Sequence, residues 1–177
     1  MRIRVAQAAD APALTGLIDA SIRGLGARFY SPEQISSSLT HLFGVDSVMI
    51  GDGTYFAVED GDNLVGAGGW SFRKTPFGGD AAGYVRDERM RVPGSDAAII
   101  RAMYVHPEHT RKGIGGLVLK ASEDAAAAQG FDRFELVSTL SGVAFYRSMG
   151  YRGMDAVQVN LPDGTVIDCL RMEKVAP

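Results

Sequence analysis

The sequence predicts an α/β fold with a mixed, mostly antiparallel sheet of six or seven strands. Residues 54–72 and 155–174 are predicted β-hairpins, because strand-like segments flank turns that contain glycine and aspartate. Between them, an apolar run at 97–105 precedes a helical pattern at 117–128 and a second strand pattern at 133–138. A strand–helix–strand crossover of this kind makes its two strands parallel.

Two helices are predicted in the first quarter of the chain. The first covers residues 11–23, with Asp10 as its cap and apolar residues at helical spacing, namely Leu14, Leu17 and Ile18. The second runs from residue 32 to about Phe43. It begins with Ser31 and Gln34, whose spacing is that of a capping box.

Residues 73–96 form an irregular stretch that mixes glycine, proline and charges of both signs. A segment of this length without regular structure is often functional in a compact domain. Three interpretations stay open at this point. The segment covers the acceptor side of an active site, contacts a second subunit, or is a partly disordered insert. The residues considered for a subunit contact are Phe77, Tyr84 and Met90.

The most informative local pattern is a basic, glycine-bearing turn between the strand at 97–105 and the following helix. It reads Thr110-Arg111-Lys112-Gly113-Ile114-Gly115-Gly116. The first N–H groups of a helix have no partner within the helix, and the helix dipole adds positive charge there. Glycine also lets a ligand approach the backbone closely. These are the features of a phosphate site, although a tight strand–helix connection would also contain glycine. The spacing fits neither a Walker A loop nor a dinucleotide-binding fingerprint.

The turn and a later segment together resemble the GCN5-related N-acetyltransferase (GNAT) superfamily. The matching patterns are Thr110-x-x-Gly113-x-Gly115 and Ser141-x-x-x-Phe145-Tyr146-x-x-x-Gly150-Tyr151. The resemblance is densest over residues 98–151. It implies the acyl-CoA N-acyltransferase fold, with about four helices around the sheet, and one GNAT domain over residues 1–177.

The resemblance also implies acetyl-CoA as cosubstrate and a set of site residues. In this family the turn holds the pyrophosphate, one strand binds pantetheine through its backbone, and a tyrosine protonates the departing thiolate. Carried onto this chain, the cofactor-binding residues are Met103, Val105, Arg111, Lys112, Gly113, Gly115, Gly116 and Ser141. Tyr146 becomes the catalytic residue, and its alternative is a tyrosine of the hydrophobic core.

Three positions depart from the family pattern. Thr110 stands where Gln or Arg is usual, Ser141 where Asn is common, and Ile99 where many members carry a glutamate. The usual candidate for a general base is therefore absent. The remaining candidates are Glu59, Asp87, Glu88 and Glu135, of which Glu135 on the parallel strand is the nearest to the expected gap. A water chain, or an amine that arrives neutral, is the alternative.

The acceptor side is predicted from aromatic and acidic residues. Candidates for the wall of an acceptor pocket are Tyr30, Trp70, Phe72 and Phe77, although Trp70 is equally suited to a core position. Asp80, Asp87 and Glu88 could attract a cationic amine, but the neighbouring arginines weaken that argument.

Composition excludes several classes of protein. The 177 residues suffice for one domain with a real core. A net charge of −3 argues against a nucleic-acid-binding protein. No apolar run approaches the roughly 18 residues that span a bilayer, so no membrane partner is expected. Residues 2–5 alternate as in a short strand and lack the apolar core of a signal peptide. The single cysteine, Cys169, cannot form an internal disulfide, which favours a cytoplasmic protein.

The function predicted from these observations is transfer of acetyl from acetyl-CoA to the primary amine of a small molecule. The alternatives are a non-catalytic acetyl-CoA-binding regulator and a protein or peptide N-acetyltransferase. The three histidines show no metal-ligand spacing, so no metal is expected. The sequence leaves open the identity of the amine and the question of a homodimer.

Overall fold

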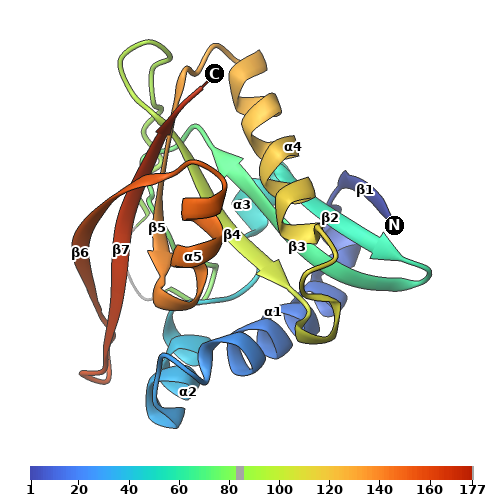
Figure 1. The fold of residues 1–177 in the computed structure, drawn as a ribbon, viewed down its shortest axis with the longest axis vertical. Coiled ribbons are helices and arrows are strands. Elements are labelled where there is room, and N and C mark those ends of the chain that lie inside the picture. Colours follow the sequence, from blue (N-terminus) through green and yellow to red (C-terminus); the bar gives the residue numbers. More distant parts are fainter. Residues whose placement is uncertain (83–85, 177) are drawn as a thin grey trace.

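The computed structural model describes residues 1–82 and 86–176, and its strands form one sheet (Figure 1). The strands are β1 (Arg2–Val5), β2 (Tyr55–Asp60), β3 (Asn63–Ser71), β4 (Ala98–Val105), β5 (Arg133–Thr139), β6 (Arg152–Asn160) and β7 (Val166–Val175). They lie in the order β1-β2-β3-β4-β5-β7-β6. The β4–β5 pair is parallel and the other neighbouring pairs are antiparallel. The predicted mixed, mostly antiparallel sheet is confirmed.

Five α-helices accompany the sheet in the described residues. They are α1 (Ala11–Gly26), α2 (Pro32–His41), α3 (Ser47–Gly51), α4 (Ile114–Ala128) and α5 (Val143–Ser148). The predicted capping box at the start of α2 is present, with Gln34 N–H donating to Ser31 Oγ over 3.2 Å. The sequence did not predict α3, a single turn capped by the Asp46 carboxylate.

The helices cover opposite faces of the sheet, as the alternation of neighbouring strand residues shows. On β2, Ala57 packs in the cluster of α1, whereas Val58 packs in the cluster of α4. On β5, Leu136 packs with α4 and α5, whereas Val137 packs in the cluster that follows α2. Successive side chains of a strand point to opposite faces. The α1–α2 face and the α4–α5 face are therefore two sides of one sheet.

Strands β4 and β5 pair over a very short length. Their register contains two residue pairs, Ala98 with Phe134 and Ile99 with Glu135. Beyond these pairs the strands diverge toward their C-terminal ends (Figure 1). The crossover through α4 starts at the end of β4, so the glycine turn lies at the open end of this divergence.

A β-bulge interrupts β4 within the diverging part. Ala67 on β3 faces Tyr104, and Gly69 faces Arg101, so one residue of β3 opposes two residues of β4. Ala102 in the bulge has a φ of 55°, in the left-handed region. Its carbonyl accepts a hydrogen bond from the buried Tyr55 hydroxyl over 3.3 Å. This contact holds a backbone conformation that alanine seldom adopts.

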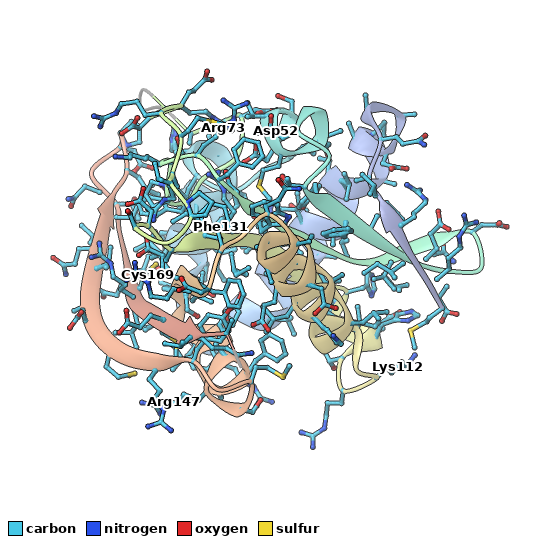
Figure 2. The ribbon with its side chains drawn as sticks, turned by 90° about the horizontal axis from the view of Figure 1, so that it is seen from above. Asp52, Arg73, Lys112, Phe131, Arg147 and Cys169 are labelled. Carbon is cyan, nitrogen blue, oxygen red and sulfur yellow. The ribbon has the colours of Figure 1, made fainter. Side chains whose placement is uncertain are left out.

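The segment of residues 73–96 folds back along itself and returns to the sheet. Backbone hydrogen bonds join Lys74 N–H to Arg89 O and Thr75 N–H to Asp87 O, both over 3.0 Å. At its base, Arg73 makes a bidentate ion pair with Asp52 at 2.7 Å (Figure 2). The described part of the expected irregular stretch is thus anchored. Tyr84, considered above for a subunit contact, lies outside the described residues.

A buried ion pair joins this segment to the sheet. Arg101 of β4 is 6% exposed and donates to Asp46 Oδ2 at 2.7 Å, to Thr75 O at 2.7 Å and to Gly78 O. Asp46 also accepts from Arg86 at 2.9 Å and from Met49 N–H at 3.1 Å. One carboxylate therefore holds β4, α3 and the 73–96 segment together.

We predict that Asp46→Asn lowers the free energy of unfolding by about 3–5 kcal/mol, because it leaves Arg101 buried without its counter-ion. Urea unfolding followed by circular dichroism measures the change. Asp124→Asn is the control, since Asp124 and Lys120 form an exposed pair that contributes at most about 1 kcal/mol. Equal midpoints for the two variants would contradict this assignment.

Candidate functional site

A cavity of about 740 Å³ passes through the gap between β4 and β5. Its walls include residues of α1 and α2 from one face of the sheet and residues of α4 and α5 from the other. The β4 wall runs over residues 100–105, and the β5 wall over 137–139. The cavity therefore lies between the helices that cover the two faces of the sheet.

The glycine turn (residues 110–116) lines the cavity at the start of α4. Arg111 and Gly113 have φ values of 61° and 81°, so the chain reverses its handedness on both sides of Lys112. Such alternation forms a concave nest of backbone N–H groups. Within the described part of the chain, no hydrogen bond is made by the N–H groups of residues 111–116. The turn thus combines free donors with a helix N-terminus, the requirements of an anion site.

Gly115 lies directly beneath the Phe145 ring of α5. A Cβ atom built on Gly115 would lie 3.2 Å from two atoms of that ring. The absence of a side chain therefore lets α5 pack against the first turn of α4. Gly113 is needed for a different reason, because its φ of 81° is strained for other residues.

The edge of β4 that faces the gap carries backbone groups of Met103 and Val105. His106 N–H donates to Val65 O on β3 over 3.0 Å, so the residue before it faces the other way. Val105 N–H donates to the Ser21 hydroxyl of α1 over 3.3 Å. By the same alternation, Met103 turns its backbone toward the gap. An extended polar chain lying along β4 could hydrogen-bond to these backbone groups in the way that a neighbouring strand would.

Tyr146 is 8% exposed and lines the cavity from α5. Its ring packs edge-on against Phe145 and Tyr151, with centroids 5.1 and 5.7 Å away. Its hydroxyl makes no hydrogen bond to any described residue. Burial raises the pKa of Tyr146, so its phenol keeps its proton at neutral pH. The residue thus belongs to the core cluster and also lines the cavity.

All the predicted site residues except Lys112 line the cavity. Lys112 is exposed on the turn, where its Nζ lies 3.5 Å from His109 Nδ1 (Figure 2). Ser141 Oγ lies 3.0 Å from Thr139 Oγ1 at the end of β5. Ser141 does not cap α5, because the cap position is taken by Gly142 without a side-chain bond.

The candidate bases lie away from the cavity. Glu135 belongs to the closed end of the β4–β5 pair and forms an ion pair with Arg91 at 2.7 Å. Glu59 pairs with Arg4 at 2.6 Å, and Asp87 pairs with Arg89 at 2.6 Å. None of the described residues that line the cavity is a carboxylate. Glu135, expected near the gap, therefore lies in the paired part of β5 and does not line the cavity.

Apolar side chains form the cavity wall on the α1–α2 face. We call this wall the apolar compartment; its residues are Ile22, Leu25, Ile35, Phe43, Phe77 and Ile167. Of the aromatic residues predicted to surround an acceptor, Tyr30 and Phe77 line the cavity. Trp70 and Phe72 do not, since they pack in the cluster of α4 and α5 on the other face.

The lining residues that the sequence did not identify include two polar ones, Ser21 and Arg101. Ser21 is buried and continues the apolar stripe of Leu14, Leu17 and Ile18 at the next helical position. A polar residue on such a stripe is the signal that could have identified it. Arg101 interrupts the apolar run of β4, and a charge inside a buried strand is a comparable signal.

The described residues contain no group of three His, Cys, Asp or Glu side chains that could hold a metal ion. None of their helices is long and apolar enough to cross a membrane.

Comparisons with known proteins agree with this geometry. A family model described as the acetyltransferase (GNAT) family matches residues 25–151. The uncharacterized N-acetyltransferase YjcF of Bacillus subtilis (strain 168) is 34% identical over 98 residues. That match covers 55% of this chain and 55% of the relative, so the chain aligns with about half of that protein's length.

Two solved structures have the same fold. A GCN5-related N-acetyltransferase of Rhodopseudomonas palustris is 20% identical with a TM-score of 0.73, over 98% of this chain and 94% of that one. The PaiA N-acetyltransferase of Thermoplasma acidophilum, solved in complex with coenzyme A, is 17% identical with a TM-score of 0.65, over 98% of both chains.

We predict that at most one of the six tyrosines titrates at an ordinary pKa in the folded protein. Burial raises the pKa of Tyr30, Tyr55, Tyr104, Tyr146 and Tyr151. Unfolded phenols have a pKa of about 10. The stability from these neutral phenols is therefore complete below about pH 10 and is lost as pH rises further. Phenolate absorbance against pH measures this, and two or more phenols ionising near pH 10 in folded protein would contradict it.

Proposed function

Because this chain belongs to the acetyltransferase (GNAT) family, we propose that it transfers acetyl from acetyl-CoA to the primary amine of a small molecule. The observation that carries this proposal is the cavity through the β4–β5 gap, with the glycine turn at the α4 face and the apolar compartment at the other. Two reactants from opposite faces can meet in it, and their joint binding removes much of the entropic barrier.

Acetyl-CoA enters on the α4–α5 face. Its pyrophosphate binds the N–H groups of residues 111–116, and Arg111 adds positive charge from the rim. Pantetheine lies along β4 and bonds to the backbone of Met103, which also polarises the thioester carbonyl. The Val105 N–H exchanges its long bond to Ser21 for pantetheine, and Ser141 contacts the same arm from the β5 side. Lys112 contributes charge at a distance, because its side chain lies outside the cavity.

The amine attacks the thioester carbon from the apolar compartment. A C–N bond forms, the C–S bond breaks, and the departing thiolate takes the phenolic proton of Tyr146. The nitrogen loses its proton to water, and the Tyr146 phenolate recovers one from solvent. The described lining residues include no carboxylate that could act as a base, so in this proposal the amine arrives neutral or passes its proton to water.

Turnover separates this proposal from its alternatives. A non-catalytic regulator would bind acetyl-CoA and release no thiol with any amine. A protein or peptide N-acetyltransferase would act on peptide amines in preference to small ones. A cytoplasmic location and a homodimer, both expected from the sequence, stay predictions.

Gly115→Val should weaken acetyl-CoA binding at least about tenfold, because a branched side chain displaces Phe145 and narrows the turn. Gly16→Val is the matched control, since Gly16 is exposed on α1 with no atom within 4 Å of an added Cβ. Isothermal calorimetry at two salt concentrations measures both variants. Wild-type affinity for acetyl-CoA in Gly115→Val, or an affinity that does not change with salt, would contradict the assignment of the pyrophosphate to this turn.

Tyr146→Phe should lower kcat roughly 10²-fold while acetyl-CoA affinity barely moves, because the ring stays and the proton donor is lost. Tyr151→Phe is the control. It removes a neighbouring buried hydroxyl that bonds to Glu123 at 2.9 Å and lies outside the cavity wall. Steady-state kinetics on a true acceptor decide the matter. If Tyr146→Phe has the same kcat as Tyr151→Phe, Tyr146 is not the proton donor and serves only in packing.

A further inference from the structure

The apolar compartment consists of hydrocarbon side chains, and Ser21, Tyr30 and Ser38 also line the cavity on this face. Phe43, Phe77 and Ile167 belong to one hydrophobic cluster that lies between α2 and the start of β7. Leu25 and Ile35 extend this wall along the two helices. Burying an apolar group against such a wall yields roughly 25 cal/mol for each Å² removed from water. The compartment therefore favours a ligand with a hydrocarbon body.

Acidic side chains near this face are directed away from the cavity. Asp80 bonds to Ser47 and to Arg86, at 3.0 and 3.1 Å. Asp46 is fully buried and satisfied by Arg101, Arg86 and the start of α3. None of the described lining residues is a carboxylate that could form an ion pair with an ammonium group. Of the acidic residues predicted to attract a cationic amine, namely Asp80, Asp87 and Glu88, none lines the cavity.

The cation of this compartment is also neutralised. Arg101 lines the cavity, but its guanidinium donates to Asp46 and to the carbonyls of Thr75 and Gly78. The other basic lining residues, His109 and Arg111, lie at the glycine turn on the side of the proposed cofactor. A carboxylate on the acceptor would therefore meet no available counter-ion in the compartment.

Because the compartment offers neither a carboxylate nor an available cation, we propose that the acceptor is a monoamine with an apolar body. Such a molecule carries neither a second ammonium group nor a carboxylate. The proposal rests on the acetyl transfer described above and names its substrate class. An unpaired charge buried on the acceptor costs several kcal/mol. The apolar wall also disfavours the ammonium form of the reacting nitrogen, which lowers its pKa and supplies the neutral amine.

A rigid series of three ligands tests the proposal. Benzylamine carries one amine, 1,4-bis(aminomethyl)benzene adds a second, and 4-(aminomethyl)benzoate adds a carboxylate at the same place. Calorimetry measures their binding to the protein saturated with CoA. We expect benzylamine to bind about 100-fold more tightly than either charged analogue, the factor that corresponds to the cost of an unpaired charge. Equal or tighter binding of either analogue would overturn the proposal.

A matched pair of variants tests the charge argument itself. Leu25 is half-buried in the cavity wall and belongs to none of the hydrophobic clusters of the described residues. Leu25→Glu should raise the affinity for the diamine relative to benzylamine at least about tenfold, because it supplies the missing carboxylate. Leu25→Gln, of the same length without charge, should keep the preference for benzylamine. An unchanged preference in Leu25→Glu would count against the proposal.

Thiol release from acetyl-CoA, measured with the same amines, keeps the two proposals apart. If benzylamine binds as expected but no thiol is released, the proposed acetyl transfer is contradicted and the proposed monoamine class is retained. Thiol release that is faster with the diamine or the amino acid would support the transfer and overturn the monoamine class.

Discussion

Strands β4 and β5 pair at only two residue pairs and then diverge. The site lies in the gap that this divergence opens. Polar backbone groups inside a protein require partners, yet the gap side of β4 loses its neighbouring strand after Ile99. On this side of β4, the Val105 N–H donates to the Ser21 hydroxyl of α1. A side chain thus replaces one hydrogen bond of the missing strand, and an extended ligand could bond to the rest of this edge.

The divergence of β4 and β5 also explains why the cavity has an anion-binding turn on one face of the sheet and an apolar wall on the other. On the α4–α5 face, the end of β4 leads into a turn with unpaired N–H groups and basic residues, which suits an anion. On the α1–α2 face, side chains of two helices and the 73–96 segment close the gap with hydrocarbon. The Asp46–Arg101 pair fixes this second wall, since it joins β4 to Thr75 and Gly78 beside Phe77.

Local patterns predicted most of the fold, because the signals that they depend on are local. The capping box of Ser31, the strand at 98–105 and the helix after the glycine turn all follow from residues near them in the chain. The same holds for the glycine turn and Tyr146, whose spacing carried the family resemblance. These residues line one cavity in the structure, apart from the exposed Lys112.

The features that the sequence did not reveal depend on long-range contacts. Asp46 and Arg101 are 55 positions apart, and neither has a neighbour that indicates the pair. Ala102 has no preference for a left-handed φ, so the bulge follows from packing against Tyr55 and β3. Glu135 was placed on the correct strand, but the point where β4 and β5 separate decides whether it faces the gap. Trp70 and Phe77 are both large and aromatic, and only the register of β3 assigns Trp70 to the opposite face.

Amide hydrogen exchange, measured with and without CoA, tests most directly whether the parted strands hold the cofactor. If the cofactor binds between the separated strands, exchange slows at least about tenfold at the N–H groups of residues 111–116 and along β4 at Met103. Exchange within the α1–α2 face should change little, because the proposed acceptor is absent. Slowing confined to α1, α2 or residues 73–80, with no change at the glycine turn and β4, would contradict the account.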